Sequence, residues 1–263
     1  MGDVLILCYH AVSEQWESSL SVTPGALESQ MEFLVSKGYR GVTFTDAVLN
    51  DHPGKVVSVT FDDAYDSISV LARPILDRFG FPGTIYAPTR YIGTGQPMSW
   101  PGIEEYIGGP DERELIPMSW ESLRSAAEAG WEIGSHTVSH PKLATLGDAK
   151  LREELVQSRD ECTSKVGTTC RSIAFPYGDC DERVIEASRE AGYSAVATIP
   201  WRLERSGRFV WPRTGVFHND SERVFRLKVS PAVRRLRASR MTSRLGPLVY
   251  FIRQGRARPE PGS

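Results

Sequence analysis

The chain has 263 residues and almost balanced charge, with 31 Lys and Arg against 33 Asp and Glu and a formal net charge of −2. With 40% hydrophobic and 24% charged residues, it has the composition of a globular protein long enough to form one large α/β domain with a sizeable core. The near-neutral charge argues against a nucleic-acid-binding protein. No apolar run approaches the ~20 residues of a membrane-spanning helix.

The opening stretch and the cysteines indicate the compartment. MGDVLILCYH has no Lys or Arg ahead of its apolar run, so it lacks the pattern of a secretory signal peptide, and we expect a cytoplasmic protein. The four cysteines, Cys8, Cys162, Cys170 and Cys180, show no C-x-x-C spacing and are expected to be reduced thiols. A disulfide between Cys170 and Cys180 is the alternative in an oxidising compartment.

Short apolar runs alternate with helical patterns along the chain. Strands are predicted at residues 4–9, 41–44, 56–61, 83–88, 131–135, 172–177, 194–199 and 209–212. Helices are predicted at residues 24–38, 66–79, 119–129, 148–166 and 181–191. Several strands are continuous apolar runs, as expected when helices cover both faces of a sheet. The alternation is repeated about seven times and predicts an α/β fold, with a parallel sheet closed into a (β/α) barrel.

One long irregular stretch, from Thr89 to Pro117, interrupts the alternation. It is rich in Gly and Pro and contains Trp100 and Tyr106. Since connections of this length inside a compact domain are usually functional, we expect a lid or a substrate-binding loop.

Polar residues follow several of the predicted strands, at the ends where a (β/α) barrel places its chemistry. They are His10, Asp62, Asp63, His136, the PYGD segment at 176–179 and Arg213. Carboxylates, histidines and an arginine would therefore converge on one mouth of the barrel, a distribution that favours an enzyme over a structural protein. His10 taken alone also fits an inert histidine at a strand end.

His136 and His140 are four residues apart, which would place both imidazoles on one side of a helical turn, a spacing used to bind metal ions. Together with Asp63 they would form a two-histidine, one-carboxylate set with positions left for water and substrate. Because neighbouring side chains diverge at a strand end, one of Asp62 and Asp63 can hold the metal while the other stays free as a base. The alternatives are a chance H-x-x-x-H pair and a helix N-cap followed by a first-turn acid.

The segments TFDD, SHTVSH and AFPYG, in this order and spacing, resemble the polysaccharide deacetylases with a NodB homology domain, carbohydrate esterase family 4. The resemblance covers roughly residues 3–216. It implies a NodB-like, distorted (β/α)7-type barrel in a single domain. We place this domain at residues 1–220, followed by a basic extension at residues 221–263.

The same resemblance implies roles for the site residues. Asp62 would be the general base, while Asp63, His136 and His140 would bind one divalent metal ion, with zinc the expected ion. The backbone N–H of Tyr177 would help to bind the oxyanion. The implied reaction is hydrolysis of the N-acetyl group of an amino sugar, which is free, nucleotide-linked, lipid-linked or oligomeric, giving acetate and an amine.

Three features depart from the family pattern. The glycine after the two aspartates is replaced by Ala64, and the arginine before the third motif by Ala174. Arg171 has the wrong parity on its strand, so Arg213 is the predicted replacement beside the base. The late Leu-x-His motif that supplies the general acid in the family is absent.

The general acid is therefore predicted elsewhere. The Tyr-His pair in LCYHAV resembles the N-terminal motif of a subgroup similar to the poly-N-acetylglucosamine deacetylases, which implies that His10 is the acid. His218, in VFHND, is the rival candidate. The alternative functions are another C–N amidohydrolase, an O-acetyl esterase, or a carbohydrate-binding relative without catalysis.

From Ser221 onward the chain carries eleven Lys or Arg against two acids. One interpretation is a solvated basic helix or tail. The other is a segment at a membrane surface, where basic side chains contact anionic lipid and apolar side chains such as Leu245 and Phe251 insert.

Overall fold

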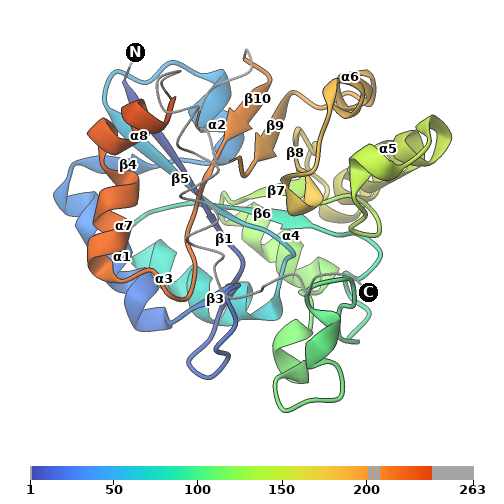
Figure 1. Cartoon of the computed structure of the whole chain (residues 1–263), viewed down its shortest axis with the longest axis horizontal. Coiled ribbons are helices and arrows are strands. Elements are labelled where there is room, and N and C mark those ends of the chain that lie inside the picture. The colour runs from blue at the N-terminus through green and yellow to red at the C-terminus, as the bar shows by residue number, and fades with distance from the viewer. Residues whose placement is uncertain (1, 201–202, 204–207, 239–263) are drawn as a thin grey trace, which may run out of the picture.

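The computed structural model describes residues 2–200, 203 and 208–238 (Figure 1). Its strands are β1 (Asp3–Tyr9), β2 (Ala11–Val12), β3 (Ser21–Val22), β4 (Tyr39–Gly41), β5 (Lys55–Phe61), β6 (Gly83–Ala87), β7 (Glu132–Ser135), β8 (Ser172–Ala174), β9 (Ala195–Thr198), β10 (Val210–Pro212) and β11 (Thr214–Gly215). Its α-helices are α1 (Pro24–Ser36), α2 (Phe44–Leu49), α3 (Arg73–Arg78), α4 (Trp120–Glu128), α5 (Asp148–Val166), α6 (Glu182–Glu190), α7 (Glu222–Val229) and α8 (Pro231–Ala238).

The strands of the main sheet pair in parallel, in the order β10-β9-β8-β7-β6-β5-β1-β11. β4 pairs with the first half of β5, on the edge that β6 takes in the second half. From β5 to β10 the spatial order follows the chain order, as expected when crossover segments connect successive parallel strands. The predicted parallel β/α architecture is confirmed.

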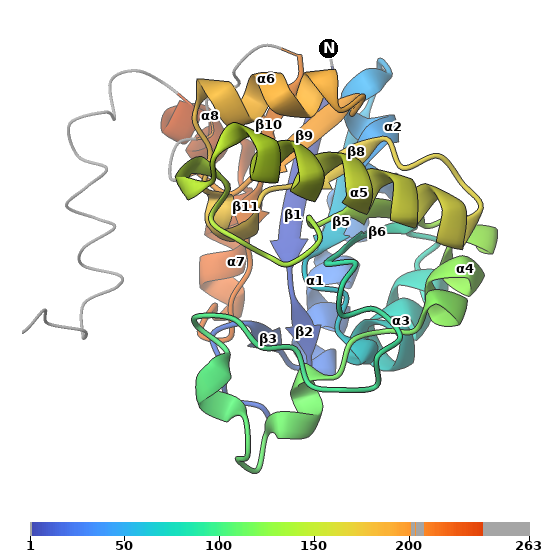
Figure 2. The same cartoon turned by 90° about the vertical axis from the view of Figure 1, so that its right-hand side faces the viewer.

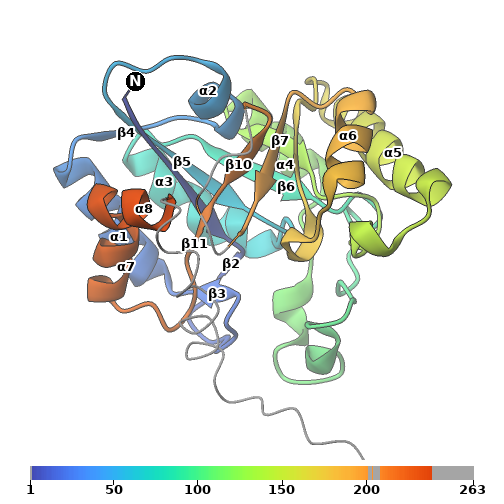
Figure 3. The same cartoon turned by 45° about the horizontal axis from the view of Figure 1, so that its top comes forward.

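One short segment of chain joins the two ends of this sheet (Figure 3). β10 pairs with β9, and β11, which begins two residues after the end of β10, pairs with β1. Arg213 stands between the two short strands, and its backbone N–H donates to Thr198 O at 2.8 Å. The sheet is therefore nearly closed into a barrel, and the side chain of the closing residue is completely buried.

Helices cover the outside of the sheet, with α1, α3 and α7 on one flank and α4, α5 and α6 on the other (Figure 1). Strand side chains meet these helices on one face and the barrel interior on the other, which explains why runs such as VVSVTF are almost continuously apolar. One large cluster of buried apolar side chains joins strands and helices, among them Leu7, Leu27, Phe61, Leu123 and Leu155. Complete burial of each contributes about 2 kcal/mol to folding.

Two predicted elements differ from the structure. Residues 41–44, predicted as a strand, contain the end of β4 and the start of α2. Thr43 caps this helix, because its Oγ1 accepts the backbone N–H of Asp46 at 3.4 Å, and this capping signal overrides the apolar run. The helix predicted at residues 66–79 begins as a π-helical turn, Ile68–Ala72, before α3.

The carboxyl ends of the strands point toward the side of the molecule that carries β2, β3 and the segment 89–117 (Figure 2). A bridge between Tyr65 and Pro117 ties the end of this segment to the residues that follow β5. The segment therefore lies at the mouth of the barrel, as the lid or substrate-loop hypothesis requires.

The first part of the basic C-terminal segment is helical and packs on the barrel. Phe225 of α7 is buried, with its ring 6.3 Å from that of Phe33 on α1. Arg234 of α8 donates to the Asp3 carboxylate at 2.5 Å. No helix in the described part of the chain is long and apolar enough to cross a membrane. The expectations for residues 239–263 concern a segment outside the described residues.

Candidate active site

The two aspartates follow β5 directly. The Asp62 N–H donates to Tyr9 O at 3.0 Å and so extends the pairing with β1, whereas Asp63 turns away with a φ of 69°. Ala64 follows with a φ of 53°, in the left-handed region that favours glycine, and an alanine there costs about 1 kcal/mol. The turn thereby aims two adjacent buried carboxylates in different directions.

The histidine motif lies in a loop after β7, and the helical turn predicted for it is wrong. Thr137 and His140 have φ values of 66° and 60°, which an α-helix does not allow. The backbone N–H groups of Val138 and Ser139 donate to the carboxylate of Glu154 at 2.8 and 2.9 Å, not to helical carbonyls. A buried acid on α5 therefore determines the conformation of this loop, which the sequence spacing alone had predicted to be helical.

Asp63, His136 and His140 nevertheless bring three donor atoms together. Oδ1 of Asp63 lies 3.3 Å from Nε2 of each histidine, and all three side chains are buried. Two N and O ligands of one tetrahedral zinc ion lie about 3.4 Å apart, since each is roughly 2.1 Å from the metal. Oδ1 of Asp63 accepts no hydrogen bond from the described residues, which is costly for a buried carboxylate unless a cation binds it. The three residues therefore fit a divalent metal ion.

Neighbouring groups fix the orientation of the His136 and His140 rings. Nδ1 of His136 donates to Ala174 O at 2.8 Å, which leaves Nε2 with the lone pair a metal needs. The His140 ring stacks on Trp100, with centroids 4.1 Å apart and planes at 22°. Ala174, at the position where the resemblance implied an arginine, therefore supplies a carbonyl to the site but no positive charge.

Arg213 forms a two-pronged ion pair with Asp62. Its two terminal nitrogens donate to Oδ1 and Oδ2 at 2.6 and 2.8 Å, and one of them also donates to Thr60 Oγ1 at 2.9 Å. Burial alone raises the pKa of Asp62, but the Arg213 charge, together with nearby His136 and His10, outweighs it, so the pKa lies below its ordinary value. Arg213 therefore lies against Asp62, and its positive charge keeps that carboxylate ionised.

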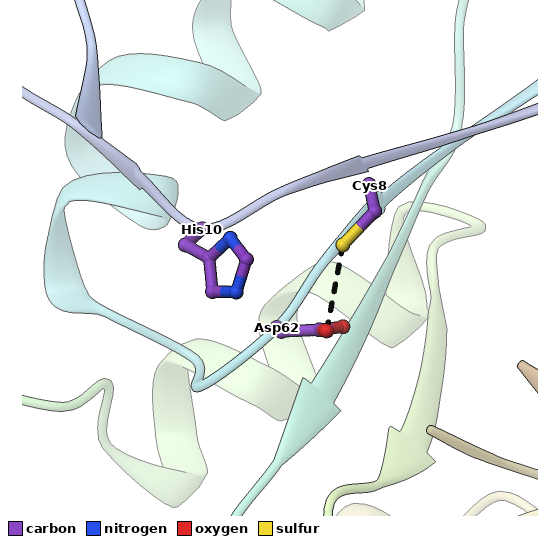
Figure 4. A group of neighbouring side chains, drawn as sticks. All are labelled: Cys8, His10 and Asp62. Carbon is purple, nitrogen blue, oxygen red and sulfur yellow. Dashed lines mark hydrogen bonds between the residues drawn. The ribbon is translucent and has the colours of Figure 1, made fainter. Parts of the chain in front are cut away.

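His10 follows β1 directly and is partly exposed. Donor atoms of His10, Asp62 and Cys8 all lie within 4.8 Å of one another (Figure 4). The Cys8 thiol donates to Asp62 Oδ2 at 3.4 Å. A histidine beside the base is in position to deliver a proton to a leaving group. The rival acid, His218, has its Nδ1 3.3 Å from Oγ of Ser21 on β3, the strand that pairs with β2 just after His10.

Tyr177 lies beside His140, with ring centroids 4.8 Å apart. It has a φ of 59° in a short turn after β8, which ends three residues earlier than the strand predicted there. Its hydroxyl donates to Pro101 O at 3.2 Å and so connects the segment 89–117 to the site. Burial, assisted by the charge of Asp63, raises the pKa of Tyr177 to about 12, so the phenol is protonated at neutral pH.

Sequence reasoning missed two residues of this site, Glu154 and Cys8. Glu154 has no exposed surface and lies three residues after buried Leu151 on α5. An acid on the apolar stripe of a helix is a signal that could have identified it. Cys8 lies two residues before His10, and side chains at that spacing project from the same face of a strand.

One family model matches this chain, and known proteins similar to it include two sequence relatives and one solved structure. The polysaccharide deacetylase family matches residues 49–196, more than half of the chain. YxkH of Bacillus subtilis (strain 168) is 27% identical over 206 residues, 76% of this chain and 66% of YxkH. The poly-β-1,6-N-acetyl-D-glucosamine N-deacetylase of Escherichia coli (strain K12) is 24% identical over 243 residues, 78% of this chain and 35% of that protein. The Streptococcus pyogenes deacetylase PplD, solved in complex with acetate, is 21% identical with a TM-score of 0.71, over 87% of this chain and 98% of PplD.

Fold and site together define a (β/α)-barrel protein with a buried carboxylate–histidine set, fit for a metal, at the carboxyl ends of its strands. Because the family match covers more than half of its length, the chain belongs to the polysaccharide deacetylase family, as predicted. The likeness to PplD concerns the fold. The chain spans about two thirds of YxkH and about a third of the Escherichia coli protein. His10 and Arg213 lie outside the matched residues 49–196.

Proposed function

We propose that this chain is a metal-dependent deacetylase that hydrolyses the N-acetyl group of an amino sugar and releases acetate. The observation that carries the proposal is the Asp63–His136–His140 set beside a second carboxylate, Asp62, which Arg213 keeps ionised. Membership of a deacetylase family supports the reaction class.

The site residues divide into a metal-binding set and a proton-transfer set. Asp63, His136 and His140 would hold the ion, for which we propose zinc, and zinc there would polarise the acetyl carbonyl and make a water more acidic. Asp62 accepts a proton from the attacking water while the water oxygen forms a bond to the carbonyl carbon. Arg213 orients Asp62 for this step through two hydrogen bonds.

The second half of the reaction needs an acid. As the carbon–nitrogen bond breaks, His10 delivers a proton to the amine nitrogen, which leaves as the free amino group. The Tyr177 N–H is our proposed donor to the oxyanion. Its left-handed backbone and the 4.8 Å ring contact with His140 support a position beside the metal-binding set.

For the substrate we propose an N-acetylated amino sugar. The name of the Escherichia coli relative supports a β-1,6-linked N-acetylglucosamine polymer. That relative is about three times as long as the region it shares with this chain, so substrate length requires its own test. Free, nucleotide-linked, lipid-linked and oligomeric N-acetyl sugars form the panel that separates these classes.

Acetate release from this panel tests the proposal directly. We expect equal amounts of acetate and free amine from at least one N-acetylated sugar, and loss of both in Asp62→Asn. Release from O-acetyl substrates alone would replace the proposal by an O-acetyl esterase. Metal binding without any release would indicate a carbohydrate-binding relative instead.

We also propose that the basic C-terminal segment contacts anionic membranes. Leu227 and Leu236, on α7 and α8, are 60% and 58% exposed, and Arg223 and Arg235 are exposed on the same helices. Vesicles with anionic lipid should bind the full chain, and less of it at higher salt or after removal of the residues from Pro231 onward. Absence of binding would leave a solvated basic segment. The cytoplasmic location stays a prediction.

A further inference from the structure

A second group of donor atoms lies beside the metal-binding set. Cys8, His10 and Asp62 offer a sulfur, a nitrogen and an oxygen within 4.8 Å of one another (Figure 4). Cys8 and His10 project from the same face of the chain at β1, and Asp62 comes from the end of β5, which pairs with β1 along its whole length. Mixed sulfur, imidazole and carboxylate donors are the ligands that zinc and similar thiophilic ions take in proteins.

We propose that Cys8, His10 and Asp62 form a second, inhibitory site for a thiophilic cation such as Zn²⁺ or Cd²⁺. The thiol proton leaves to solvent as the sulfur–metal bond forms, so Cys8 binds as a thiolate. The ion would occupy the proposed base and the proposed acid at once, and neither could then transfer a proton. The inhibition rests on the proposed function, whereas the binding does not.

The spacing of the donors supports the site. Cys8 Sγ and Asp62 Oδ2 lie 3.4 Å apart. A sulfur and an oxygen ligand of one tetrahedral zinc ion lie about 3.6 Å apart, from Zn–S and Zn–O distances of roughly 2.3 and 2.1 Å. The His10 ring has to move closer, and its buried Nδ1 has no hydrogen-bond partner in the described part of the chain, so rotation of the ring breaks no bond at that atom.

Charge determines the order in which the two sites fill. Arg213 holds Asp62 with both terminal nitrogens, and its positive charge opposes a cation at this carboxylate. Each Asp62 oxygen keeps a further lone pair, so the ion pair and a metal can coexist. The Cys8 thiolate offsets part of the repulsion, which favours thiophilic ions over Mg²⁺ or Ca²⁺. The second site therefore fills after the Asp63 set, at higher metal concentration.

Titration of the metal-free full chain with Cd²⁺ tests the binding without reference to activity. The Asp63 set has no sulfur, so the first equivalent should give no thiolate-to-metal charge-transfer absorption in the ultraviolet. The second equivalent should produce this absorption. It should disappear in Cys8→Ser and persist in two matched controls, Cys162→Ser and Cys180→Ser.

Zinc inhibition supplies the second readout. In the unmodified chain, activity at excess zinc should be at most a tenth of the activity at one equivalent. In Cys8→Ser the two activities should be nearly equal. Absorption that persists in Cys8→Ser, or that vanishes in Cys162→Ser, overturns the proposal. If the chain releases no acetate at all, the proposed function fails, and the absorption still decides this site. Cys8→Ala replaces Cys8→Ser should the serine variant not fold, with binding of the first equivalent as the measure of folding.

Discussion

Two acids at opposite ends of the sheet have very different surroundings. Glu132 begins β7 at the amino end, where one carboxylate oxygen accepts the Thr45 N–H and hydroxyl at 2.8 and 3.1 Å and the other accepts the Ser172 hydroxyl at 2.6 Å. Asp63 follows β5 at the carboxyl end, where Oδ1 accepts no hydrogen bond from the described residues. Glu132 thus ties α2 to the sheet, while Asp63 is left for a cation.

The difference separates a structural acid from a functional one. A buried polar group with all its partners contributes to stability, whereas one without a partner costs roughly 1–3 kcal/mol or more. Such a group persists where a ligand completes it. Glu154 belongs with Glu132 by this criterion although it lies close to the histidines, because both its oxygens accept hydrogen bonds. We infer that it positions the histidine loop and does not bind the metal.

The largest effects should come from the two adjacent aspartates. Asp63→Asn should remove the metal and the activity together. Asp62→Asn should keep the metal and lower turnover by roughly two to four orders of magnitude, the usual contribution of a general base. Elemental analysis of both variants alongside turnover makes the comparison. Equal metal loss in both variants would contradict the assignment of metal binding to Asp63 and of the general base to Asp62.

His10→Ala should lower N-acetyl hydrolysis by about a hundred- to ten-thousand-fold, since an amine leaves poorly unless it is protonated. A phenolate leaves without such help, so hydrolysis of an aryl acetate ester should be largely spared. The metal content measured in parallel should not change. Collapse of both activities with loss of the ion held by the Asp63 set would make His10 a ligand of that ion, and unchanged amide hydrolysis would direct attention to His218.

Arg213→Ala should lower turnover by about a hundredfold, because Asp62 loses the group that orients it. The sign of the pH effect follows from the ion pair. Arg213 lowers the pKa of Asp62, so its removal raises that pKa, and the acidic limb of the rate profile should move to higher pH. Arg213→Lys should move the limb less than the alanine variant. An acidic limb that stays in place in both variants would contradict the assigned role of Arg213.

Glu154→Gln and Glu132→Gln form a matched pair with smaller effects. Glu154→Gln weakens the bonds that hold residues 138 and 139, so metal affinity should fall about tenfold. Glu132→Gln should lower the melting temperature and leave metal affinity within about twofold, because Glu132 contacts α2 and not the histidine loop. Competition with a chromophoric chelator measures both affinities. Equal affinity changes in the two variants would remove the distinction between these acids.

The sequence predicted the barrel and the membership of the site better than its local geometry. The apolar strand runs were predicted correctly because parallel strands covered on both faces need apolar side chains, and the polar residues after them lie at the carboxyl ends of the strands. The loop from His136 to His140 was wrongly predicted as a helical turn. Its conformation depends on hydrogen bonds to Glu154, which is distant in sequence and reaches the loop only when α5 packs against the sheet. The sequence also did not predict that Arg213 lies where the barrel closes. β10 and β11 are too short for the sequence pattern to show that they are two strands, one paired with β9 and the other with β1.

The central claim is that turnover requires an ion bound by Asp63, His136 and His140, and metal depletion tests it most directly. The full chain should carry about one tightly bound divalent ion, lose acetate release on chelation, and regain it with one equivalent of zinc or cobalt. Recovery should fail in Asp63→Asn, whose fold can be verified by its melting temperature. Full activity in a preparation shown by elemental analysis to contain no metal would contradict the account.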